Sequence, residues 1–149
     1  MMDTQPVLYI LARSDLASMN AGKLAAQCCH AANDFTATMD RLNSIQEIND
    51  SDEHVDTLYQ YNEWLNESEA RTFGTTIILD GIDEKTILNL NERFLFFQKN
   101  SGIIVDDTYP VRDGQVTHLI PLITCMWVFA EDRNDTIFTS ALDSFNLYP

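Results

Sequence analysis

The residues of this sequence that could carry chemistry first gather in one short segment, "NAGKLAAQCCHAAND", residues 20–34. With about 3.6 residues per helical turn, Lys23, Gln27 and His30 fall on one face of a helix. A lysine in the first turn, beside free backbone N–H groups, can hold a phosphate or an oxyanion. The glutamine and the histidine can contact a ligand or hold their neighbours in place. This polar stripe is therefore either a solvated surface or the wall of a site.

The elements around the stripe place it at one end of a sheet. The apolar run "VLYILA", residues 7–12, predicts a central strand covered on both faces. Asn20 is the predicted N-cap of a helix over residues 21–39. In α/β sheets, ligands bind beyond the carboxyl ends of the strands, where helix N-termini point. The turn from Asn20 to Lys23 is therefore the favoured place for an anion.

The rest of the chain predicts further helices and strands in alternation. We expect a polar loop over 43–56, a helix over 55–67, a strand over 75–81, a helix over 83–101, a short strand over 103–105, a loop or hairpin over 108–121, a strand over 122–130 and a closing helix capped by Asn134 or Asp135. This order predicts a single α/β domain over residues 1–149. Its architecture would be a three-layer sandwich, with a four-stranded, mostly parallel (mixed) sheet and helices on both faces.

Charge is the most unusual feature of the composition. Nine Lys and Arg face 23 Asp and Glu, for a net charge of −14, and residues 42–70 hold eight acids with no Lys or Arg. Nucleic-acid binders normally carry a basic face, so this balance argues against extensive phosphate contacts. A local positive funnel inside an acidic shell remains compatible with it. Solubility, local steering of a substrate and nucleic-acid mimicry each explain the acidity.

The three cysteines and the apolar runs exclude several other classes. The cysteines show no CxxC spacing, which predicts reduced thiols and neither a disulfide framework nor a metal site. The run at residues 7–12 is too short to cross a bilayer and has no cationic leader. We therefore expect a cytoplasmic protein with no membrane partner.

The segment "RSDLASMNAGKLAAQCCHAA" resembles the signature of the type II peptidyl-tRNA hydrolases, the archaeal and eukaryotic kind. In that family an Arg-x-Asp-Leu segment precedes a Gly-Lys pair and then Ala-Ala-Gln-Cys-x-His-Ala. The matching residues here are Arg13, Asp15, Leu16, Gly22, Lys23, Ala25–Cys28, His30 and Ala31. The resemblance extends more weakly over nearly the whole chain.

The resemblance implies an enzyme that cleaves the ester joining a peptide to the 3′ end of tRNA, with no metal and no cofactor. Its catalytic groups would be Lys23, an Asp and a Thr. The Asp is matched by Asp106, with Asp107 an equal claimant. The Thr is matched by Thr124, or by Thr117 if "DGQVT" is aligned instead. Such a set suits ester hydrolysis, because a carboxylate can orient or deprotonate a water while a cation stabilises the oxyanion.

Other residues of the signature are candidates for binding the substrate. They are Arg13, Asp15, Asn20, Gln27 and His30. Arg13 and Asp15 can equally pair with each other to fix their loop, and His30 can equally make a structural hydrogen bond. Cys28 and Cys29 are predicted to be packing residues, because no base stands at a useful spacing from them.

Three departures from the family pattern keep other functions open. The family's Asp-Ala-Gly segment has become "DDT", the loop between Asp106 and Thr124 is longer, and basic residues around Lys23 are few. One alternative is a repurposed scaffold that binds or cleaves a small nucleotide-like ligand. Another is an acidic interaction or nucleic-acid-mimic module without a working site. The resemblance is also compatible with a homodimer.

Overall fold

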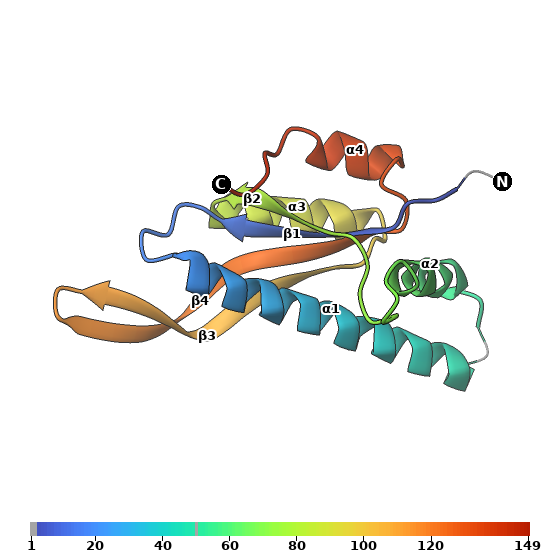
Figure 1. Ribbon diagram of the computed structural model, residues 1–149, viewed down its shortest axis with the longest axis horizontal. Coiled ribbons are helices and arrows are strands. Elements are labelled where there is room, and N and C mark those ends of the chain that lie inside the picture. The colour runs from blue at the N-terminus through green and yellow to red at the C-terminus, as the bar shows by residue number, and fades with distance from the viewer. Residues whose placement is uncertain (1–2, 50) are drawn as a thin grey trace.

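A four-stranded sheet lies between two layers of helices in the computed structural model, which describes residues 3–49 and 51–149 (Figure 1). The elements follow the predicted order of strands and helices. They are β1 (Val7–Arg13), α1 (Ala21–Asn49), α2 (Val55–Leu65), β2 (Thr76–Ile82), α3 (Glu84–Phe96), β3 (Ser101–Asp113), β4 (Val116–Ala130) and α4 (Thr136–Leu142).

The sheet is mostly antiparallel, so the prediction of a mostly parallel sheet was wrong. The strand order is β2-β1-β4-β3, and only β1 and β2 are parallel neighbours. A helical crossover joins β1 to β2, which gives a parallel pair. A tight turn containing Gly114, with φ of 60°, joins β3 to β4 and forces them to run in opposite directions. Because β4 then inserts between β1 and β3, it is antiparallel to both.

Both faces of the sheet are packed, as the apolar run in the first strand predicted. All seven residues of β1 are buried. Leu8 and Ile10 belong to the cluster that includes Phe35 of α1. Tyr9 and Leu11, which alternate with them, belong to the opposite cluster, which includes Phe94 of α3. The sandwich of three layers is therefore confirmed, with α1 and α2 below the sheet and α3 and α4 above it in Figure 1.

Helix α1 is longer than the sequence predicted. It runs to Asn49, into the first half of the segment expected to be a loop. Ile45 and Ile48 are exposed there, so this part of the helix has no apolar stripe that the sequence could reveal. Although α1 has 29 residues, neither it nor any other helix in the described residues is long and apolar enough to span a membrane.

The hairpin of β3 and β4 is also longer than predicted, and it projects beyond the body of the sheet (Figure 1). The short strand over 103–105 and the excursion over 108–121 are parts of this one hairpin. Helix α3 ends at Phe96, well before residue 101, and Gln98 adopts a left-handed φ of 57° just after it. The chain leaves α3 early enough to supply residues to the start of β3.

A bulge in β4 interrupts the pairing of the hairpin near its base. Ile104 pairs with Cys125, whereas Val105 pairs with Ile123. Thr124 is therefore an extra residue on β4 with no partner of its own in the ladder. Such a bulge breaks the strict alternation of side chains between the two faces of a sheet.

A second bulge follows on the other strand. Asp106 pairs with Leu122, and the next pair is Tyr109 with Ile120, so β3 carries one residue more than β4 in this interval. Because each strand has gained one residue, the outer hairpin returns to the register of the inner part. The shift is confined to the short stretch between the two bulges.

Candidate active site

Helix α1 begins against the base of the hairpin. The side chain of Asn20 accepts a hydrogen bond from the backbone N–H of Lys23 at 2.9 Å, which confirms its predicted capping role. The Lys23 ammonium donates to the carbonyl of Pro110 at 3.4 Å. It also lies 5.4 Å from the centroid of the Tyr109 ring. The charge of Lys23 is thus held at the junction of α1 and β3.

One turn further along α1, Gln27 is buried against the two strands of the hairpin, with 3% of its surface exposed. Its Nε2 donates to Oδ2 of Asp106 at 2.7 Å. Its Oε1 accepts from the hydroxyl of Thr124 at 2.6 Å. A carboxylate can only accept, so this pairing fixes the orientation of the amide. Gln27 therefore joins a carboxylate on β3 to a hydroxyl on β4.

The bulges are what bring these side chains to the α1 side of the sheet. Cys125 faces α1, and its thiol lies 3.5 Å from the carbonyl oxygen of Gln27. In a regular strand Thr124, as the next residue, would face the opposite layer. As the extra residue of the bulge it contacts Gln27 instead. The second bulge does the same for Tyr109, which lies an odd number of residues after Asp106 and yet meets α1 as well.

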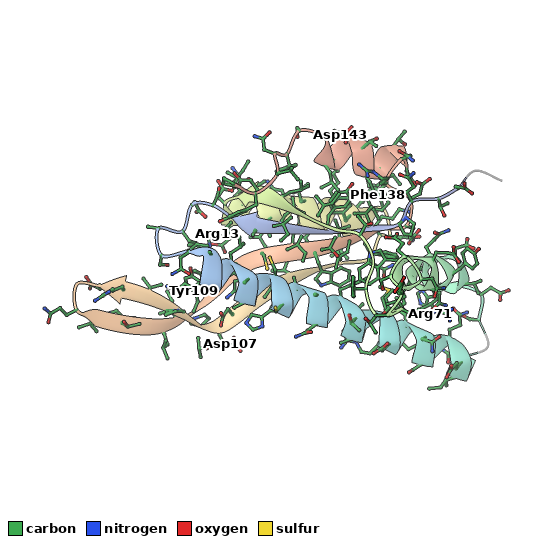
Figure 2. All side chains as sticks on the ribbon, viewed as in Figure 1. Arg13, Arg71, Asp107, Tyr109, Phe138 and Asp143 are labelled. Atoms are coloured by element: carbon green, nitrogen blue, oxygen red, sulfur yellow. The ribbon has the colours of Figure 1, made fainter. Side chains whose placement is uncertain are left out.

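Asp106 is held in its charged form. Burial raises the pKa of its carboxyl, but the hydrogen bonds from Gln27 and from the backbone N–H of Thr108, together with the nearby His30, outweigh that effect. The pKa therefore lies below its ordinary value. Asp107 is exposed on the outer side of the hairpin (Figure 2), so of the two claimants Asp106 is the one beside Gln27.

The two threonines that matched the family pattern lie in different places. Thr124 is fully buried behind Gln27. Thr117 is exposed on the outer hairpin, opposite Arg112. The structure therefore brings Thr124, and not Thr117, together with Asp106.

Arg13 and Asp15 form the pair that the sequence allowed. Nε and Nη2 of Arg13 each lie 2.8 Å from a carboxylate oxygen of Asp15. The hydrogen bond from Arg13, which is the largest influence, holds the pKa of Asp15 below its ordinary value. Nη1 of Arg13 donates to the carbonyl of Ile123 at 3.0 Å. This pair fastens the loop after β1 to the residue that precedes Thr124.

His30 and the cysteines stand apart from the hydrogen-bonded groups. His30 is exposed on α1. Burial raises the pKa of the Cys28 thiol to about 11 and that of Cys125 to about 12, so both are protonated at neutral pH. Cys28 is half-buried, in keeping with a packing role, but Cys29 is exposed, so the packing prediction was wrong for Cys29.

Sequence reasoning missed Tyr109. It assigned this residue to a loop or hairpin without a functional role, yet Tyr109 is fully buried, and Ser18 donates to its hydroxyl at 3.1 Å. Figure 2 shows Tyr109 at the beginning of α1, beside the base of the hairpin. An aromatic residue three positions after the candidate Asp was the available signal, but its direction depends on a bulge that the sequence does not reveal.

The site holds an ionised carboxylate and a buried hydroxyl on one amide, with a cation one helical turn before that amide on α1. These groups can orient a water, accept a proton and stabilise a developing negative charge. In the described part of the chain, no three His, Cys, Asp or Glu side chains gather as a metal site requires.

Comparison with known proteins yields one family. The family model described as "Peptidyl-tRNA hydrolase PTH2" matches residues 6–128. This range includes Lys23, Gln27, Asp106 and Thr124. No curated protein matches the chain.

Proposed function

The chain belongs to the PTH2 family of peptidyl-tRNA hydrolases, which are ester hydrolases, and from that premise we propose that Lys23 and Asp106 carry its chemistry. The observation that supports this assignment is the bridge of Gln27 between Asp106 and Thr124, one helical turn from Lys23. The bridge, together with the contact of Lys23 with Pro110, supports a role for a cation and an oriented carboxylate at the hairpin base.

In this proposal Asp106 orients the attacking water. Its free lone pairs can accept a hydrogen bond from that water while Gln27 and Thr108 hold the carboxylate still. A lowered pKa makes Asp106 a weak base, so it takes up the proton of the water as the new C–O bond forms rather than before. Asp106 then returns this proton to the departing 3′ oxygen of the tRNA.

Lys23 stabilises the charge that develops on the ester carbonyl oxygen. One N–H of its ammonium is directed at the carbonyl of Pro110, which leaves the others for the substrate. The charge collapses when the bond to the 3′ oxygen breaks, which leaves a free tRNA and a peptide carboxylic acid that loses its remaining proton to solvent. The resemblance implies that no metal is needed, and this mechanism calls on none.

Thr124 acts behind Gln27 in this scheme. Because its side chain is fully buried, we assign it to holding the Gln27 amide and, through it, Asp106. This differs from the direct catalytic role that the resemblance implies. Arg13 and Asp15 fasten the loop beside it, and we assign contact with the terminal nucleotide to the exposed Asn20 and His30.

The substrate that the family implies is peptidyl-tRNA. The homodimer and the cytoplasmic location remain predictions, the first from the resemblance and the second from the composition.

The test is release of an N-blocked amino acid from aminoacyl-tRNA by purified protein. We expect Lys23→Ala and Asp106→Asn each to lower kcat by about 100-fold or more, the range typical of a lost acid–base or charge-stabilising group. Matched controls are Lys85→Ala, which removes an exposed lysine from the first turn of α3, and Asp107→Asn, on the neighbouring exposed carboxylate. Wild-type rates in folded Lys23→Ala and Asp106→Asn proteins would overturn the assignment.

A further inference from the structure

Tyr109 contacts Lys23 through the face of its ring, and we infer from this geometry that Tyr109 is a positioning residue for the reaction. Its π face holds the Lys23 ammonium where the oxyanion forms. This inference rests on the proposed role of Lys23, and it assigns to Tyr109 no contact with the substrate.

The ammonium has two contacts on β3. Its nitrogen lies 5.4 Å from the centroid of the Tyr109 ring, within the range of a cation–π interaction. The same nitrogen donates to the carbonyl of Pro110 at 3.4 Å. A lysine side chain has four rotatable carbon–carbon bonds and samples many rotamers when it is free. The ring and the carbonyl together restrict it to the hairpin base.

The ring itself is immobilised. Tyr109 is fully buried. Its hydroxyl accepts a hydrogen bond from Ser18 at 3.1 Å and lies 3.9 Å from the sulfur of Met19. Both residues belong to the loop that leads into α1. The hydroxyl is therefore engaged with the loop, and the face of the ring remains for Lys23.

Substitution can separate the role of the Tyr109 hydroxyl from that of the aromatic face. Phenylalanine at position 109 loses the contacts with Ser18 and Met19 but keeps the aromatic face. Tyr109→Leu keeps an apolar but smaller side chain without any π face. If the face positions Lys23, the aromatic variant retains most of the turnover that the aliphatic variant loses.

Substitutions of Tyr109 should change kcat rather than KM. The proposed task of Lys23 is to stabilise charge that appears only as the ester is attacked, and such interactions change kcat more than KM. We expect Tyr109→Leu to lower kcat by about tenfold, with KM changed by less than about twofold. Tyr109→Phe should recover kcat to within about threefold of wild type. The matched control is Tyr59→Leu, an exposed tyrosine on α2, which should leave both constants unchanged.

Because Tyr109 is fully buried, Tyr109→Leu can lose activity through misfolding. The decisive series therefore keeps the shape of the ring. Phenylalanine and phenylalanines with one, two and three ring fluorines are incorporated at position 109, which progressively weakens the negative potential of the face. We expect kcat to fall stepwise along the series, at an unchanged unfolding temperature. In a Lys23→Met background, which keeps the chain length without the charge, the residual kcat should be the same for every ring.

The outcomes separate this inference from the proposed function. A constant kcat across the fluorinated series, with Lys23→Met still strongly impaired, overturns the role of Tyr109 and leaves that of Lys23 intact. An equal decline in the Lys23 and Lys23→Met backgrounds also overturns it, because the ring would then act without the ammonium. Full activity of Lys23→Met removes the proposed function itself.

Discussion

The hydroxyl of Thr124 donates to Gln27 at 2.6 Å from a position that a regular strand would turn toward α3 and α4. The bulge in β4 turns the Thr124 side chain toward α1, and this contact forms as a result. Gln27 in turn donates to Asp106 across the hairpin. The orientation of Asp106, the carboxylate that we propose to be catalytic, therefore depends on a hydroxyl that is fully buried.

Replacing Thr124 by Val should weaken both stability and turnover. Valine keeps the shape but leaves Oε1 of the buried Gln27 without a donor, which costs about 1–3 kcal/mol of unfolding free energy. Thr124→Ser restores the hydroxyl and should recover most of both losses. Urea unfolding and ester-release assays on the same preparations measure the two effects.

The matched control is Thr117→Val, on the exposed part of the hairpin. It should change the unfolding free energy by less than about 0.5 kcal/mol. If Thr117→Val impairs turnover and Thr124→Val does not, the assignment of Thr124 to the site is wrong.

The hydrogen bond from Gln27 predicts a shift in the acid limb of the pH–rate profile. This bond helps to hold the pKa of Asp106 below the ordinary value of 3.8. Gln27→Met removes the donor, so the pKa should rise and kcat/KM should begin to fall at a higher pH. Thr124→Val keeps the donor and should shift the midpoint of the limb less than Gln27→Met does.

The lowered pKa of Asp106 also determines how its contribution to stability changes with pH. Because the folded pKa of Asp106 is depressed, its contribution to folding is present above the unfolded pKa and is lost as the pH falls through the folded pKa. Asp106→Asn should therefore flatten the loss of stability below about pH 4. An acid unfolding curve that Asp106→Asn leaves unaltered would show that the pKa of Asp106 is the same in the folded and the unfolded chain.

Salt should affect this hydrolase weakly. Each phosphate contact with a single-stranded end contributes about −0.7 to the slope of log K against log salt. The net charge of −14 leaves few cations for such contacts, and salt also screens the repulsion between protein and tRNA. We expect log(kcat/KM) to change with a slope of about −1 to −2, and close to zero for an N-blocked aminoacyl-adenosine without phosphates. A slope of about −5 would reveal an extended basic surface.

Cysteine chemistry should be dispensable. With a pKa of about 11, the Cys28 thiol is a thiolate in only about one molecule in 10,000 at pH 7. Cys28→Ser should therefore leave kcat unchanged while lowering the unfolding temperature, because a hydroxyl replaces a half-buried sulfur. Complete loss of turnover in a folded Cys28→Ser protein would place a nucleophile where we propose none.

The order of the elements was predictable, because the sequence shows it locally. The continuous apolar run of β1 and the capping side chains of Asn20 and Asp135 each act over a few residues. Strand direction was not predictable in the same way. β3 runs in the same direction as β1, as helical connections suggested, but β4 inserts between them, and that choice depends on pairing between segments far apart in the chain.

The members of the site were predictable in part. Lys23, Gln27, Asp106 and Thr124 were matched by their order along the chain. In the structure Gln27 is hydrogen-bonded to Asp106 and to Thr124, and Lys23 lies one helical turn before it. The choices of Asp106 over Asp107 and of Thr124 over Thr117 needed the register of the hairpin. Tyr109 could not be found, because alternation along a regular strand places it on the wrong face.

The two bulges of the hairpin amount to a pair of compensating insertions. Each alone would shift the pairing of the whole outer hairpin by one residue, whereas together they restore the pairs of a plain ladder and turn the outer side chains of both strands to the opposite faces. The stretch between them can therefore change its length only in matched steps on both strands. A deletion of Thr124 alone, or of one residue between Asp106 and Tyr109 alone, should lower stability more than a deletion of both residues. This order is expected even though the double deletion removes both of the bulges that turn side chains toward α1.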